Sequence, residues 1–147
     1  MGEPNSLFLI REYLNPLINL DELKWAYPSN GIHESIDWMC NRLPSYQVFE
    51  GEYRYPTFIK RPINVAKTID DILPNIPLYM SNPFSATGNF DSRYHEVCDR
   101  YDIPIYLDLA FVGSTGPFKL KLYPIEVILL PLLFKMFFVS LCPCIAT

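Results

Sequence analysis

Two polar loops and one carboxylate are the parts of this chain whose residue types and spacing could do chemistry. The first loop covers residues 81–88, and the second, 106–111, contains Asp108. A buried carboxylate is unfavourable unless a positive or hydrogen-bonding partner accompanies it. Asp108 could therefore face the protonated ring nitrogen of a ligand, or it could be an ordinary turn or cap residue at a strand end. Taken alone, the residue favours the second interpretation.

The elements around these loops predict a strand–helix–strand unit. Residues 76–80 and 103–107 are short apolar runs typical of strands. Between them, apolar residues recur at the spacing of a helix with one buried face, at Phe90, Tyr94, Val97, Cys98 and Tyr101. Asn89 is the expected N-cap of this helix. Such units are normally parallel and right-handed, so both loops should lie at the carboxyl edge of one sheet, where α/β folds bind ligands.

Other segments give weaker patterns. Helices are expected over residues 7–13, 20–25 and 32–40, a strand over 46–50, a short helix over 65–72, and a last apolar element from residue 125.

In order and at this distance, the two loops resemble the large domain of the fold-type-I pyridoxal-phosphate enzymes, the aspartate aminotransferase superfamily. The pattern of that family is a strand, Asn-Pro-x-x-x-Thr-Gly, a helix, a strand and Asp-x-Ala-Tyr. Here it stands as Asn82-Pro-Phe-Ser-Ala-Thr-Gly88 and Asp108-Leu-Ala-Phe111. The resemblance is good over residues 76–113 and weaker elsewhere. It implies an α/β fold, a three-layer α/β/α sandwich around a mainly parallel sheet, present as a partial large domain.

The resemblance also implies that a cofactor, pyridoxal 5'-phosphate, carries the chemistry. In the family a lysine forms a Schiff base with the cofactor aldehyde, and an aspartate keeps the pyridine nitrogen protonated. Asp108 takes the second role. Lys135 ends the apolar run 126–134, and with the Met-Phe that follows it resembles the Lys-x-Phe end of the family's Ser-x-Ser-Lys-x-Phe, so the resemblance gives it the first role. The alternative for Lys135 is an isolated charge in an apolar tail.

Three further positions correspond to residues that contact the cofactor in the family; one has the family's residue and two do not. Asn82 opens the first motif, and Ser85 stands where the family has an asparagine that touches the phenolic oxygen of the cofactor. Phe111 stands where the family has a tyrosine, so it has no hydroxyl to donate. The small residues expected before Lys135 are replaced by Leu-Leu-Phe.

Two upstream segments complete the implied cofactor site. Asn30, Gly31 and Ile32 open a helix and match the turn that holds the cofactor phosphate, although an ordinary helix start would look the same. Tyr55, before a proline, is the first choice for the aromatic that stacks on the pyridine ring, and Tyr53 is the second. Ordinary packing is the alternative for both tyrosines.

Composition limits the other function classes. The 147 residues carry a net charge of −4 without a basic cluster, so nucleic-acid binding is not expected. The four cysteines form neither a disulfide framework nor a set of metal ligands, and no metal site is expected. Reduced thiols and the absence of a signal-like N-terminus predict a cytoplasmic protein.

Three parts of the chain are expected: an N-terminal helical segment over 1–28, a partial cofactor-binding large domain over 29–124, and an apolar segment over 125–147. The last segment has only Glu126 and Lys135 as charges. It could be an aberrant or truncated end, a buried strand pair, or a membrane anchor, in that order of preference. The second domain that family members have is missing, which suggests a truncated member.

The sequence therefore predicts a pyridoxal-phosphate-dependent enzyme of aminotransferase type, acting on an amino acid or amine. Transamination, decarboxylation and β-elimination share this scaffold and are not separated by the sequence. A homodimer is implied by the resemblance only. The alternatives are a non-catalytic remnant or interaction module that keeps the fold, and a tail-anchored membrane protein.

Overall fold

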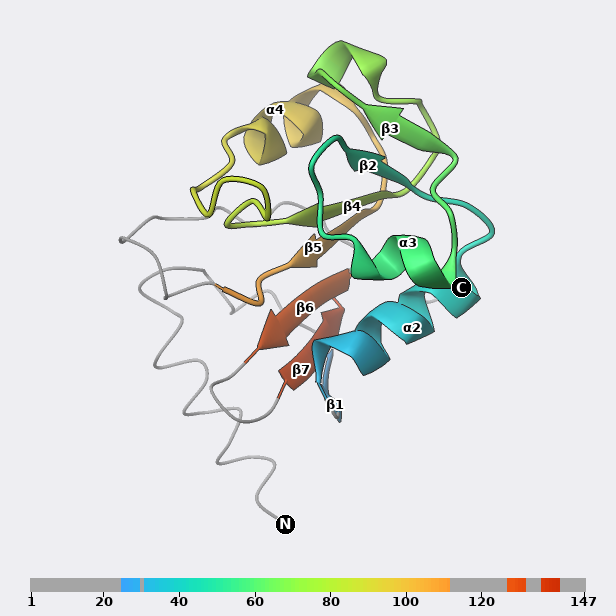
Figure 1. The fold of residues 1–147 in the computed structure, drawn as a ribbon, viewed down its shortest axis with the longest axis vertical. Helices are drawn as coiled ribbons and strands as arrows, with labels where there is room; N and C mark the ends of the chain where they lie inside the picture. Colours follow the sequence, from blue (N-terminus) through green and yellow to red (C-terminus); the bar gives the residue numbers. More distant parts are fainter. Residues whose placement is uncertain (1–24, 30, 112–126, 132–135, 141–147) are drawn as a thin grey trace.

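The computed structural model describes residues 25–29, 31–111, 127–131 and 136–140, with side chains for 31–111 (Figure 1). The elements in chain order are β1 (Trp25–Ser29), α2 (Ile32–Arg42), β2 (Gln47–Phe49), α3 (Tyr55–Ile59), β3 (Asn64–Ala66), a 3-10 turn η1 (Ile69–Asp71), β4 (Leu78–Ser81), α4 (Arg93–Arg100), β5 (Ile105–Asp108), β6 (Val127–Pro131) and β7 (Met136–Ser140). Within these residues no helix has the length and apolar character needed to cross a membrane.

All the described strands belong to one sheet, in the order β1-β7-β6-β5-β4-β2-β3. Neighbouring strands from β3 to β6 run parallel, whereas β7 is antiparallel to both of its neighbours. The expected α/β fold with a mainly parallel sheet is therefore confirmed. The pairing of β4 with β5 sets Ser81 opposite Asp108, so the two strands that precede the predicted loops end side by side.

Helices cover both faces of this sheet. Successive strand residues point to opposite faces, and apolar residues on each face pack against a helix. Val48, Tyr79 and Tyr106 pack in one cluster with Ile36 and Met39 of α2. On the other face, the guanidinium of Arg93 in α4 lies 3.9 Å above the ring of Phe49, the neighbour of Val48. The helices α2 and α3 lie together on one side and α4 on the other, which is the expected three-layer arrangement (Figure 1).

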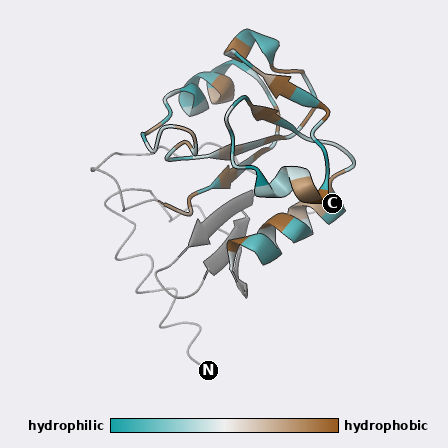
Figure 2. Ribbon diagram, in the orientation of Figure 1, coloured by the Kyte–Doolittle hydropathy of each residue, from teal (hydrophilic) through white to brown (hydrophobic). Residues whose placement is uncertain are grey.

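The helix α2 shows why these residues form this layer. Its buried side chains, Ser35, Ile36, Met39 and Cys40, recur at helical spacing and face the sheet. Hydrophobic and hydrophilic residues alternate along its length (Figure 2). The helix ends at Arg42, after which Leu43 is extended and its backbone N–H donates to the carbonyl of Met39.

Two predictions about helices were wrong, for local reasons. Asn89 does not cap α4, because its backbone closes the preceding loop through a bond from Phe84 N to Asn89 O, and the helix begins only at Arg93. The short helix predicted over 65–72 is a strand followed by a 3-10 turn, because β3 pairs with β2. Pairing in the sheet outweighs local helix propensity there.

The ends of the chain join the same sheet as its centre. β1 crosses the boundary expected at residue 28, and Trp25, expected to end a helix, begins this strand instead. The predicted helix over 7–13 lies outside the described residues. β6 and β7 fall in the apolar segment 125–147 and pair with each other and with β5 and β1.

Candidate functional site

A cavity of about 490 Å³ lies at the carboxyl ends of β4 and β5. This volume falls within the range of roughly 300–1,000 Å³ that is typical of small-molecule sites. Side chains from α2, from the loop after β2 and from the loops after β4 and β5 form its wall: Ile32, Tyr53, Ser81, Pro83, Phe84, Ser85, Gly88, Asp108, Ala110 and Phe111.

Asp108 is the buried carboxylate of this cavity, with only 3% of its surface exposed. Its Oδ2 accepts a hydrogen bond from the hydroxyl of Tyr79 at 2.5 Å, and its Oδ1 accepts one from the backbone N–H of Ala110 at 2.8 Å. Burial raises the pKa of Asp108, although both hydrogen bonds act in the opposite direction. Within the described residues no lysine or arginine forms an ion pair with it. A cation in the cavity would therefore stabilise its charged form.

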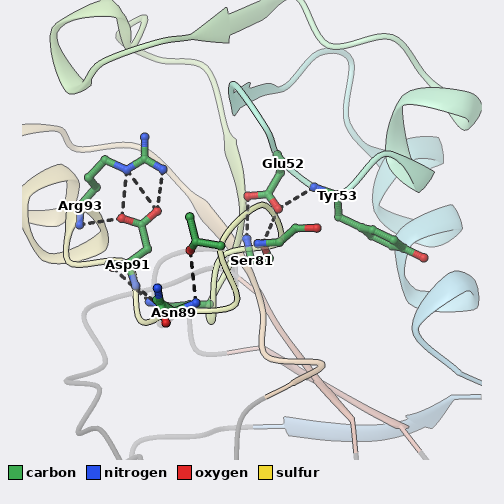
Figure 3. A network of polar contacts seen from close by, with 9 residues as sticks. Glu52, Tyr53, Ser81, Asn89, Asp91 and Arg93 are labelled. Atoms are coloured by element: carbon green, nitrogen blue, oxygen red, sulfur yellow. Dashed lines mark hydrogen bonds and ion pairs between the residues drawn. The ribbon is translucent and has the colours of Figure 1, made fainter. Parts of the chain in front are cut away.

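The loop after β4 is braced by its own polar groups. Asn82 is fully buried, and its side-chain oxygen accepts from the backbone N–H of Asp91 at 3.1 Å while its amide donates to the Asp91 carbonyl at 3.3 Å. Asp91 in turn accepts from the backbone and the guanidinium of Arg93 at the start of α4 (Figure 3). The backbone N–H of Asn82 donates to the Asp108 carbonyl at 2.8 Å. The Asn-Pro motif thus holds its loop against the end of β5.

A second buried carboxylate lies behind the cavity wall. Glu52, 8% exposed, accepts from the backbone N–H of Ser81 at 2.9 Å through Oε2. Its Oε1 accepts from the Ser81 hydroxyl and, at 2.8 Å, from the backbone N–H of Tyr53 (Figure 3). The Ser81 hydroxyl oxygen also accepts from the backbone N–H of Ser85 at 3.0 Å. Burial raises the pKa of Glu52 to about 7, with the nearby Asp108 adding to the rise.

Tyr53 and Tyr55 are divided between the cavity and the helix α2. Tyr53 lines the cavity, and its hydroxyl lies 3.0 Å from Nε2 of His33. Tyr55 begins α3, stacks on the His33 ring at a centroid distance of 3.7 Å, and donates to Asp37 Oδ1 at 2.9 Å. Of the two tyrosines, only Tyr53, the second choice from the sequence, lines the cavity, whereas the Tyr55 side chain packs on His33 and bonds to Asp37 of α2.

Four of the residues predicted to bind the cofactor lie together in the cavity wall: Ile32, Ser85, Asp108 and Phe111. Gly31 precedes Ile32 as the N-cap of α2, with a φ of 112°. Asn82 and Tyr55 do not line the cavity, because their side chains bond to Asp91 and Asp37. Asn30 and Lys135 lie outside the described residues, and Lys135 belongs to the connection between β6 and β7.

Sequence reasoning missed Glu52, Ser81 and Tyr79. Each of the three lies in or next to a segment used to predict the site, but no pattern in the sequence shows that these polar side chains are buried. The signal that could have found Glu52 is its position two residues beyond the expected strand 46–50, at the same sheet edge as Asp108. Ser81 is the last residue of β4 and directly precedes the Asn-Pro motif.

The described groups can bind a flat, partly apolar ligand that carries both a cation and an anion. The carboxylate of Asp108 suits a protonated nitrogen, and the ring of Tyr53 offers a flat apolar surface. The helix α2 begins at the cavity with Ile32, and the N-terminus of a helix favours a negative group such as a phosphate.

No family profile and no curated protein sequence matches the chain. The structure is similar to the solved structure of an L-threonine-O-3-phosphate decarboxylase from Porphyromonas gingivalis, with a TM-score of 0.59 and 13% sequence identity. The similarity covers 78% of this chain and 46% of that one, so the chain spans about half the length of this neighbour. At this identity the likeness shows the fold alone, an α/β fold built on a mainly parallel sheet.

Proposed function

We propose that the cavity binds pyridoxal 5'-phosphate and that the chain forms part of an enzyme that acts on an amino acid or amine. One observation carries the proposal: Asp108 is a buried carboxylate without a described cationic partner, placed in a ligand-sized cavity at the carboxyl end of β5. A protonated pyridine nitrogen supplies the missing positive charge. The fold similarity supports the same class of enzyme.

The described residues fit such a ligand in three respects. Asp108 would hold the proton of the ring nitrogen, and Tyr53 would lie against the ring. Gly31 and Ile32, with Asn30, would receive the phosphate at the start of α2. Ser85 would donate its hydroxyl toward the phenolic oxygen, a role that Phe111 cannot share because it has no polar atom.

Lys135 is the residue that we propose for covalent attachment of the cofactor. It follows β6, which runs parallel to β5 and therefore ends at the same sheet edge as Asp108. When bound, the cofactor supplies a protonated ring that withdraws electrons from the substrate. The lysine amine would hold the cofactor and would move a proton at the α-carbon of the substrate. A homodimer and a cytoplasmic location are part of this proposal.

The proposal covers the chemistry that transamination, decarboxylation and elimination have in common, and it does not choose among these three reactions. Threonine phosphate decarboxylation is named for the structural neighbour, and it is one candidate among these reactions. The cavity contains no described arginine that could hold a substrate carboxylate, so that group would come from outside the described residues.

The test is a titration of the purified chain with pyridoxal phosphate, followed by tyrosine and tryptophan fluorescence and by visible absorbance. We expect saturable binding by the wild-type chain and binding weaker by roughly tenfold or more in Asp108→Asn, since a buried charge pair is lost. Asp102→Asn, which changes an exposed aspartate, is the matched control and should bind as the wild type does.

Equal binding by Asp108→Asn and the wild type would contradict the proposed role of Asp108. Binding without any new visible band would favour the alternative of a non-catalytic module. The replacement of a tyrosine by Phe111, which is 69% exposed, is the observation that favours this alternative.

A further inference from the structure

The most unusual polar group outside the proposed contacts is Glu52, because it holds one residue of the cavity wall through two atoms. Both Ser81 N–H and Ser81 O–H donate to its carboxylate, while Ser81 itself lines the cavity. Glu52 does not line the cavity. Its contacts with the cavity wall are the two bonds from Ser81 and one from the backbone N–H of Tyr53, and only the Ser81 hydroxyl can change its hydrogen-bonding role.

We propose that Glu52 is a positioning residue whose charge decides whether Ser81 offers the cavity a lone pair or a hydroxyl donor. This inference rests on the proposed function only for the identity of the ligand. The geometry that carries it is the hydrogen bond between Ser81 Oγ and Glu52 Oε1 (Figure 3), together with the bond from Ser85 N–H to the same Ser81 oxygen.

The two states differ in one proton. When Glu52 is ionised, the Ser81 hydroxyl donates to Oε1 and one of its lone pairs accepts from Ser85, which leaves a single lone pair for the cavity. When Glu52 takes up a proton from solvent, its O–H donates to the Ser81 oxygen instead. Both Ser81 lone pairs are then occupied, and its own proton is available to a ligand acceptor.

The surroundings of Glu52 determine which state is present near neutral pH. Asp108 at the end of β5 repels its negative charge, whereas the backbone N–H groups of Ser81 and Tyr53 favour that charge. Tyr79 of β4 is the other titratable group that senses Glu52, and burial keeps its pKa well above the usual value, so it stays neutral. Protonation of Glu52 near pH 7 follows from the burial that also fixes its geometry.

The first test uses the ligand-free wild-type chain and therefore does not depend on the cofactor. Carbon-13 NMR should show the Glu52 carboxyl titrating near pH 7, and the Ser81 Cβ and Ser85 amide signals should move with the same midpoint. In Ser81→Ala the midpoint should rise by about half a pH unit or more, because a donor to the carboxylate is lost. A Glu52 midpoint near 4.5, or Ser81 signals that do not follow it, would overturn the proposal.

The second test compares dissociation constants for pyridoxal phosphate in the wild type, Glu52→Gln and the matched control Glu50→Gln, which changes an exposed carboxylate. The Glu52→Gln variant keeps the side chain neutral and lets an amide donate to Ser81 Oγ at every pH, although the amide nitrogen no longer accepts from Tyr53 N–H. The ratio of wild-type to Glu52→Gln constants should be near one at pH 6 and rise to about tenfold at pH 8.5, since Ser81 of the wild type then offers the anionic ligand a lone pair in place of a hydroxyl donor.

A ratio that is constant with pH, or one that Glu50→Gln reproduces, would contradict the role of Glu52. Failure of the wild type to bind pyridoxal phosphate at any pH would instead reject the proposed function. The NMR titration would still decide the coupling between Glu52 and Ser81 in that case.

Discussion

At the scale of single residues, two carboxylates at one sheet edge are buried and have raised pKa values, Asp108 and Glu52. Asp108 could be found from the sequence because it ends an apolar run and, together with the Asn82 motif, carries the resemblance to the pyridoxal-phosphate enzymes. The position of Glu52 after a predicted strand is visible in the sequence, but its contact with Ser81, 29 residues away, is not. The choice between Tyr53 and Tyr55 also depended on where α3 begins, which the sequence analysis did not predict.

Replacing Asp108 with asparagine should stabilise the empty chain while weakening ligand binding. Burial makes the charged carboxylate costly, and an amide can still accept from Ala110 N–H. We expect the free energy of unfolding at pH 8 to rise by about 1 kcal/mol, as measured by urea denaturation without ligand. A fall of similar size would mean that Asp108 is a structural residue whose charge is already satisfied.

The burial of Glu52 predicts a pH dependence of stability. Its folded-state pKa of about 7 lies above the ordinary value of 4.5, so the folded chain binds this proton more tightly than the unfolded chain does. The stabilisation is fully present below about pH 4.5 and is lost as the pH rises through 7. The free energy of unfolding of Glu52→Gln, relative to the wild type, should therefore increase by on the order of 3 kcal/mol between pH 5 and pH 8.5. A difference that is flat over this range would contradict the raised pKa.

At the scale of elements, the site depends on two loops that approach closely. Gly51, after β2, has a φ of 87°, and a Cβ added there would lie 3.0 Å from the Cβ of Ala86 in the loop after β4. Gly88 has a similar φ of 70° but no atom within 4 Å of its added Cβ. A comparison of alanine substitutions at the two glycines therefore separates the effect of backbone strain from the effect of the contact between the loops.

We expect Gly51→Ala to lower the free energy of unfolding by about 2–3 kcal/mol and Gly88→Ala by about 1–2 kcal/mol, since only the first adds a close contact to the unfavourable backbone. Urea denaturation of both variants measures the difference. If Gly88→Ala lowered the free energy of unfolding more than Gly51→Ala, the close contact with Ala86 would not be the reason that residue 51 must be a glycine.

The elements that the sequence predicted correctly are those with local patterns. The strands β4 and β5 and the helix α4 between them follow from apolar runs and helical spacing. The start of α4 was missed because it is set by the side chain of Asp91, which Asn82 holds from the other end of the loop. The helix α3 was not predicted, although its Pro56 lies in the first turn, where a helix tolerates a proline well.

At the scale of the whole molecule, the mainly parallel sheet and its two helical layers were predicted through the resemblance carried by residues 76–113. The order of the strands could not be predicted, because β1 and β7 pair across most of the chain length. This order places the carboxyl end of β6 at the sheet edge that carries Asp108.

Ligand binding should stabilise the whole folded chain. A ligand that binds only the folded state adds about 2.7 kcal/mol at a concentration one hundred times its dissociation constant. Pyridoxal phosphate at saturation should therefore raise the melting temperature of the wild type by several degrees, while inorganic phosphate alone should have a smaller effect. An unchanged melting temperature under conditions that saturate the fluorescence signal would place the binding outside the folded site.

The most direct test of the central claim is to reduce the pyridoxal-phosphate-loaded chain with borohydride and map the labelled peptide by mass spectrometry. The account predicts one adduct, on Lys135, that disappears in Lys135→Arg and is weaker in Asp108→Asn. Label spread over Lys60, Lys67, Lys119 and Lys121, or unchanged labelling in Lys135→Arg, would contradict a cofactor site built on Asp108 and Lys135.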